Sequence, residues 1–438
     1  MKLSVDKLQR RIPLTSRFLF ISFLYIIICI GTLAAQGGVD EARRTNVYAD
    51  ELKCLQVHLA GDVLSPPILR TDQRQVAEIS FDILGHDYHP LSYIVEHCDA
   101  DWKPSQLATA EFLDGMPSLI TDYTPSRATT TLYTHYRMTF PNDEVRPRIS
   151  GNYALRVFSQ ANPSRMLLTA CISVTESLVM LKSQVTGMTL TDFNREHQQV
   201  DFQIITDRLS ISNPAADLKI RILQNRRFDN MAVDPMPTGV MPGRITYDPN
   251  RALIFAAGNE YRRFEFLTAS YNGMGVENTR FYNPYYHVTL QTLFPRPISY
   301  EYDQDQNGRY FIRCSRCTDY ATEADYYFVH FSLKSPQIPG GNLYIMGDLT
   351  YNMPDLRSQM EYNAATESYE KHLFLKQGHY NYALLFVPNG RSSAESAPIE
   401  RNFYQTENEY YIYVYYRPFG ARYDRLIAFS RIDSSPSR

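Results

Sequence analysis

Cysteine is scarce in this sequence, and its distribution excludes a disulfide framework. The 438 residues include six cysteines, and one of them, Cys29, lies in an apolar run near the N-terminus. The other five are an odd number, so at least one stays unpaired even in an oxidising compartment: they are Cys54, Cys98, Cys171, Cys314 and Cys317. No second cysteine pair follows the last two at metal-site spacing, which favours a local disulfide or two ordinary thiols over a zinc site.

Basic residues do not cluster beyond the N-terminus, and this argues against a nucleic-acid partner. The formal net charge is −3, and the segment up to Ala35 carries five basic residues against Asp6 alone. The rest of the chain therefore has a net charge of about −7. A surface that binds phosphates needs a concentration of Lys and Arg that this chain lacks.

Long apolar runs are missing except for one, from Phe18 to Ala35, which follows the basic residues. This order predicts a signal peptide over residues 1–35, with cleavage before Ala35 or Gln36. An uncleaved membrane anchor is the alternative, because the run is about as long as the roughly 20 residues that cross a bilayer. We therefore expect an exported protein that is soluble, either in the periplasm or outside the cell.

The spacings of common enzyme motifs are also missing. No nucleophile elbow, phosphate loop or zinc-protease helix is present. Gly273-Met274-Gly275 lacks the third glycine of a dinucleotide site, and His86 and His89 have no neighbours to complete a metal shell. We expect no enzymatic activity, no catalytic residues, no metal and no cofactor, and no small-molecule substrate.

Aromatic residues and strict alternation are abundant, and both indicate strands. The chain has 33 Tyr and 23 Phe but only one Trp. Ile79, Phe81 and Ile83 alternate with polar Ser80 and Asp82, and the same pattern recurs along the chain, as expected for half-buried strands. Short strands separated by Pro, Asn and Gly predict a mainly β fold of tandem antiparallel immunoglobulin-like β-sandwich domains.

Polar, unpatterned stretches suggest three such domains after the leader. We predict an N-terminal sandwich over 36–176, a second over 177–300 and a third over 301–438. The third is similar to early-set immunoglobulin-like modules found beside glucan-processing enzymes, because it contains Gly347-Asp348-Leu349-Thr350-Tyr351-Asn352. Asn352 stands where those modules have a sugar-stacking Trp, which weakens an inference of sugar binding.

The two predicted strands at the C-terminus could belong to one of two structures. Tyr410 to Pro418 and Arg425 to Arg431 could be mistaken for the terminal β-sandwich that serves as the sorting signal of type IX cargo proteins. We instead expect them to close the third domain, so that their deletion would unfold it.

Ordered segments along most of the chain resemble the plug protein family of the type IX secretion system. The longest runs from Ile94 to Ser105 and includes Glu96-His97-Cys98-Asp99-Ala100-Asp101-Trp102-Lys103. Others are Leu55-Gln56-Val57-His58-Leu59, Pro67-Ile68-Leu69-Arg70, Glu111-Phe112-Leu113-Asp114-Gly115, Ile120-Thr121-Asp122-Tyr123, Tyr133 to Asn142, Ser150-Gly151-Asn152-Tyr153, Leu223-Gln224-Asn225 and Gly258 to Phe264.

The resemblance implies a periplasmic protein that docks on the large outer-membrane β-barrel translocon and seals its periplasmic opening when no substrate is in transit. A wide barrel leaves an aqueous hole that such a body can cover. Two other classes stay open: a carbohydrate-binding surface or periplasmic protein, suggested by the Tyr-rich strands, and an unrecognised hydrolase built on sandwiches.

One cluster is a candidate for partner contact. Trp102 lies among Asp99, Asp101 and Lys103, and aromatic anchors often dominate interfaces. The alternative is a core Trp at the edge of a sandwich, with the acids serving as turn residues.

Overall fold

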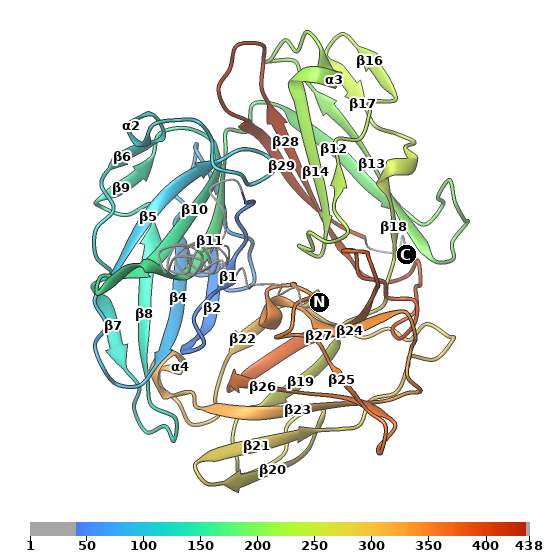
Figure 1. The fold of residues 1–438 in the computed structure, drawn as a ribbon. Coiled ribbons are helices and arrows are strands. Elements are labelled where there is room, and N and C mark those ends of the chain that lie inside the picture. Colours follow the sequence, from blue (N-terminus) through green and yellow to red (C-terminus); the bar gives the residue numbers. More distant parts are fainter. Residues whose placement is uncertain (1–40, 435–438) are drawn as a thin grey trace, which may run out of the picture. The chain divides into compact units, whose positions relative to one another are not determined.

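The computed structural model describes residues 41–434 and is built almost wholly of β-strands (Figure 1). Its strands form three sandwiches, each with two sheets around a hydrophobic core. The prediction of a mainly β fold with several antiparallel β-sandwich domains is confirmed. The pairing is antiparallel with two exceptions among the named strands, β3 beside β11 and β21 beside β23.

The first sandwich packs its two main sheets around Phe81, Tyr136, Tyr153 and Leu155. One sheet has the order β1 (Asn46–Val47), β11 (Asn162–Thr175), β10 (Gly151–Ser159) and β5 (Leu91–Cys98), with β3 (Ile68–Arg70) beside β11. The other contains β2 (Leu52–Leu59), β4 (Ala77–Leu84), β8 (Tyr133–Phe140) and β7 (Asp122–Pro125). The short α2 (Thr109–Phe112), β6 (Leu113–Gly115) and β9 (Val145–Pro147) complete it.

The second sandwich is centred on Phe202, Ile220, Ile222 and Val414. One sheet contains β12 (Met180–Thr186), β13 (His197–Ile205), β17 (Arg244–Thr246), β16 (Gly239–Met241) and β18 (Ile254–Ala256). The other has the order β15 (Ala232–Val233), β14 (Leu218–Gln224), β28 (Glu409–Tyr416) and β29 (Arg425–Asp433). The short helices are α3 (Pro214–Asp217) and η2 (Arg251–Leu253).

The third sandwich buries Phe264, Phe331, Tyr380 and Leu384 between its sheets. One contains β19 (Arg262–Phe266), β27 (Gly378–Pro388), β22 (Tyr310–Ile312) and β24 (Gly341–Met346). The other has the order β20 (Val276–Tyr282), β21 (Tyr285–Leu290), β23 (Tyr326–Lys334), β26 (Ser368–Lys376) and β25 (Glu361–Asn363). The helices α4 (Tyr320–Glu323) and η3 (Asp348–Thr350) lie in its loops.

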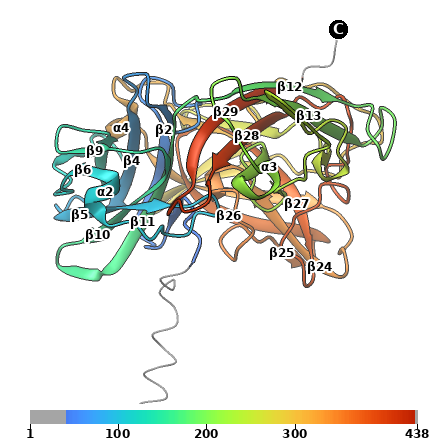
Figure 2. The ribbon, with the colours of Figure 1, turned by 90° about the horizontal axis from the view of Figure 1, so that it is seen from above.

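The prediction that the last two strands close the third sandwich is wrong. Strand β28 pairs with β14 from Leu218↔Tyr416 to Gln224↔Tyr410, and β29 pairs with β28. Figures 1 and 2 show both C-terminal strands, in red, among the green strands of the second sandwich. The third sandwich is therefore inserted into the second. The prediction failed because the alternation of apolar and polar residues shows that a segment is a strand but not which strand it pairs with.

The predicted signal peptide, residues 1–35, lies outside the described residues. None of the helices among residues 41–434 has the length and apolar character that a membrane crossing requires.

The insertion changes what a C-terminal truncation should do. Removing residues 409–434 leaves β14 paired only with the two-residue β15, so we expect the second sandwich to unfold while the third keeps its core. Hydrogen exchange should show lost amide protection in β13 and β14, with β23 and β27 still protected. Loss of protection in β23 and β27 alone would contradict this topology.

Candidate functional site

The three sandwiches meet around one backbone carbonyl. The oxygen of Leu64, in the first sandwich, accepts a hydrogen bond of 2.5 Å from Arg226 Nη2 and one of 3.1 Å from Arg309 Nη1. Arg226 follows β14 of the second sandwich, and Arg309 precedes β22 of the third. Segments far apart in the sequence are thus joined at a single point.

Arg309 also binds the second sandwich through a buried ion pair. Its two terminal nitrogens reach the carboxylate of Glu409 at 2.5 and 3.0 Å, so the contact is bidentate. Tyr411 donates its hydroxyl to the same carboxylate, and Arg431 lies 3.1 Å from it. Burial favours the protonated acid, but the guanidinium of Arg309 outweighs this effect and lowers the pKa of Glu409.

A second buried ion pair joins the first and third sandwiches. Asp82 of β4 accepts from Lys376 Nζ of β26 at 2.6 Å, and the two side chains are 1% and 2% exposed. His135 Nδ1 and the Tyr326 hydroxyl lie 2.6 Å from the same carboxylate. Burial alone would raise the pKa of Asp82, but Lys376 and His135 hold it below its usual range. The acid is therefore ionised at neutral pH.

Aromatic rings enclose the ammonium group of this pair. Lys376 Nζ lies 4.1 Å from the ring centre of Tyr133 and donates to the carbonyl of Ala321 at 2.7 Å. The Tyr133 hydroxyl crosses to the third sandwich and donates to the carbonyl of Ala324 at 2.7 Å. A desolvated cation over a ring face is stabilised by about 2 kcal/mol. The whole group thus belongs to the interface of the two sandwiches.

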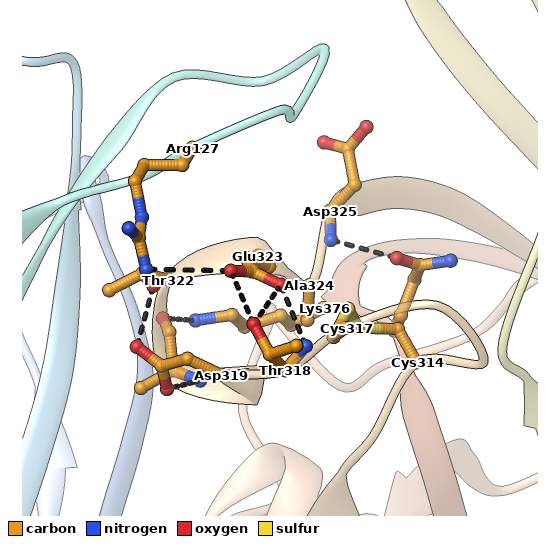
Figure 3. Close-up of a disulfide and its surroundings, with 12 residues drawn as sticks. Arg127, Cys314, Cys317, Thr318, Asp319, Thr322, Glu323, Ala324, Asp325 and Lys376 are labelled. Carbon is orange, nitrogen blue, oxygen red and sulfur yellow. Dashed lines mark hydrogen bonds and ion pairs between the residues drawn. A yellow bond between two sulfur atoms is a disulfide. The ribbon is translucent and has the colours of Figure 1, made fainter.

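A disulfide precedes the loop that contributes these carbonyls. Cys314 and Cys317 are bonded, which settles the alternative left open by the sequence in favour of a local disulfide. Figure 3 shows the disulfide beside α4, where Arg127 of the first sandwich reaches Glu323 at 3.4 Å. The bond closes the turn from Cys314 to Cys317, just before α4, which lies against the first sandwich.

The other described cysteines are unreactive. Cys54, Cys98 and Cys171 are free thiols. Burial raises the pKa of Cys54 and of Cys171 to about 12, so neither forms a thiolate at neutral pH. Among residues 41–434, no group of three or more His, Cys, Asp or Glu is placed to hold a metal ion.

The first and second sandwiches meet at the turn that contains Trp102. The Asp99 carboxylate lies 3.0 Å from Arg417 Nη2, and Asp101 accepts from the backbone N–H of Lys103 at 3.1 Å. Trp102 is 8% exposed and has a positive φ of 65°. The cluster thus divides: Asp99 faces the second sandwich, Trp102 is buried, and Asp101 and Lys103 are exposed. Their part in partner binding stays a prediction.

Trp102 borders a pocket of about 450 Å³ where the three sandwiches meet. The first sandwich contributes Arg44 and the edge of β2, and the second contributes Phe228 and Tyr413. The third contributes the segment 351–354, so Asn352 lies in this wall.

The crossing from the second to the third sandwich uses the sequence segment Gly258 to Phe264. Glu260 is 2% exposed, and it accepts from the Tyr300 hydroxyl at 2.5 Å and from the Glu407 N–H at 3.1 Å. Burial raises the pKa of Glu260 to about 7, although both hydrogen bonds favour the ionised form. This acid therefore gains its charge near neutral pH.

Sequence reasoning missed Asp82, Lys376, Arg309, Glu409 and Glu260. The alternating pattern predicts that Asp82 faces solvent from a half-buried strand, but both faces of β4 are covered at this position. A polar residue in an alternating strand gives no signal of a second interface. Of these five residues, only Glu260 lies in a segment, Gly258 to Phe264, that resembles the plug family.

Comparison with known proteins agrees with this architecture. Residues 52–176 match the family model described as type 9 secretion system plug protein 1st domain. The first sandwich thus resembles the plug protein family of the type IX secretion system. The match covers the first sandwich, and it connects the chain with type IX secretion rather than with an enzyme family.

A crystal structure of a hypothetical protein from Parabacteroides merdae extends the likeness to all three sandwiches. It is 48% identical, with a TM-score of 0.89, and the alignment covers 90% of this chain and 100% of that chain. No curated protein matches the sequence.

The Asp82–Lys376 pair should be sensitive to removal of one partner. Replacing Lys376 with Met leaves a buried carboxylate without its cation, so we expect a loss of about 3–5 kcal/mol in the free energy of unfolding. Lys334→Met, which breaks the exposed pair with Glu367, should change it by less than about 1 kcal/mol. Calorimetry checks both. The double variant Asp82→Leu/Lys376→Met should recover most of the loss. If Lys376→Met and Lys334→Met lowered the free energy of unfolding equally, the Asp82–Lys376 pair would not be the buried contact described here.

Glu260 should make stability depend on pH. Between the unfolded pKa of about 4.3 and the folded value of about 7, the folded state keeps a proton that the unfolded state releases. The free energy of unfolding should therefore fall as pH rises through this window, by roughly 3 kcal/mol in total. Glu260→Gln should remove this part of the dependence, and exposed Glu367→Gln should not. Thermal unfolding at pH 5 and pH 7.5 measures it.

Proposed function

We propose that this protein is a periplasmic plug that docks on the outer-membrane type IX translocon barrel and seals its periplasmic opening when no substrate is in transit. The observation that carries the proposal is the set of buried ion pairs that join three sandwiches in a chain whose first sandwich resembles the plug family. Domains in one chain usually move relative to each other unless their interface is large and buried. Here the interfaces contain desolvated charges that tolerate one geometry.

A fixed body suits the task physically. A barrel wide enough for folded cargo leaves an aqueous hole, and a cover must keep its outline to hold back solutes. The proposed action needs no chemistry, only shape and a docking surface that releases when cargo arrives. The carbohydrate-binding alternative has no comparable support, because Asn352 offers no ring for sugar stacking.

Outer-membrane permeability tests the sealing function. Deleting the gene should increase uptake of vancomycin, which is too large for ordinary porins, and a plasmid copy should restore the barrier. The control is a strain that also lacks the barrel: the added uptake should disappear there, because no hole remains to be sealed. Unchanged uptake, or a leak that persists without the barrel, would overturn the proposal.

Occupancy tests the docking step separately. A tagged barrel isolated from cells with secretion blocked by depletion of cargo should carry more of this protein than one from secreting cells. Equal amounts in both states, or none in either, would contradict displacement by cargo.

A further inference from the structure

The junction pocket has the size of a small-molecule site. Its volume of about 450 Å³ lies within the range of roughly 300–1,000 Å³ that such sites occupy. It is too small for a folded partner. Aromatic and aliphatic side chains from all three sandwiches form most of the wall, including Trp102, Phe228, Tyr413, Val57 and Met353.

Arg44 is the unusual group in this wall. Its guanidinium carbon lies 4.1 Å above the ring centre of Phe228, and Nη1 donates to the carbonyl of Arg43 at 2.7 Å. Among residues 41–434 it forms no ion pair. Burial lowers the pKa of Arg44, as expected for a cation without a carboxylate partner.

The other charged groups of the wall are neutralised. Arg226 lies 3.4 Å from Asp348, and Asp229 lies 2.6 Å from Arg227. Arg44 therefore leaves the pocket with an uncompensated positive charge. A stacked guanidinium keeps its N–H groups in one plane, where they can bind an acidic group through two parallel hydrogen bonds.

A second polar atom of the wall also lacks a partner. The side-chain oxygen of Asn352 is buried and accepts no hydrogen bond, while its nitrogen donates to Asp348 at 3.1 Å. An unsatisfied buried acceptor costs about 1–3 kcal/mol. A ligand with an N–H or O–H group would satisfy it.

We propose that the junction pocket binds a small amphipathic organic anion. Its acidic group pairs with Arg44, its apolar body packs between Trp102, Phe228 and Tyr413, and a donor group reaches Asn352. This activity is separate from sealing, and it would hold if the protein had no role at the barrel. Because each sandwich contributes to the wall, binding would also brace their arrangement.

The single tryptophan makes the test specific to this site. Trp102 is the only Trp in the chain, so energy transfer from tryptophan to a bound dye reports on its neighbourhood. The probes are anilinonaphthalene sulfonate and phenylnaphthylamine, which has the same rings without the sulfonate. With the full mature chain, we expect saturable transfer to the anionic dye at one site, with at least tenfold tighter binding than the neutral dye.

Matched variants separate the charge from the apolar wall. Arg44→Met should weaken the anionic dye at least tenfold and leave the neutral dye unchanged, which also shows that the pocket is intact. Phe228→Ala should weaken both dyes. Arg146→Met changes an exposed residue of the first sandwich and should change neither.

Three results would each overturn the proposal. These are no transfer from Trp102 to either dye, equal affinity for the two dyes in the wild type, and an anionic-dye affinity that survives Arg44→Met. The permeability and occupancy experiments have independent readouts, so failure here leaves the plug proposal standing, and the reverse also holds.

Discussion

Opposite charges buried between the sandwiches hold the three sandwiches in one arrangement. Moving a carboxylate and an ammonium out of water costs several kcal/mol per ion, and only close, fully hydrogen-bonded geometry offsets that cost. Asp82 and Lys376 meet this condition between the first and third sandwiches, and Arg309 and Glu409 meet it between the second and third. A small rotation of one sandwich would leave these charges buried and unpaired.

This constraint connects the fold with the proposed plug function and with the junction pocket. A cover over an aqueous opening must resist deformation, and the buried pairs supply that resistance without any catalytic group. The same packing encloses a space in which Arg44 pairs with no carboxylate of residues 41–434. The pocket exists only while the three sandwiches keep their positions, so the proposed ligand would bind only to this arrangement.

The insertion of the third sandwich into the second strengthens this link. The chain leaves the second sandwich after β18 and returns to it at β28, so two crossings join the same pair of sandwiches. Glu260 lies at the first crossing and contacts Glu407 near the second. Two connections restrict relative motion more than the single linker of a tandem arrangement, which suits the proposed plug.

The mainly β class and the resemblance to the plug family could be read from the sequence, because alternation such as Ile79-Ser80-Phe81-Asp82-Ile83 and ordered local segments are properties of neighbours along the chain. Three features follow only from the folded structure: β28 pairs with β14, Asp82 is buried against Lys376, and Arg44 and Asn352 share a pocket with Trp102. The physical reason is that periodicity identifies which face of a strand is apolar. It carries no information about which distant segment covers the other face, or which charges meet there.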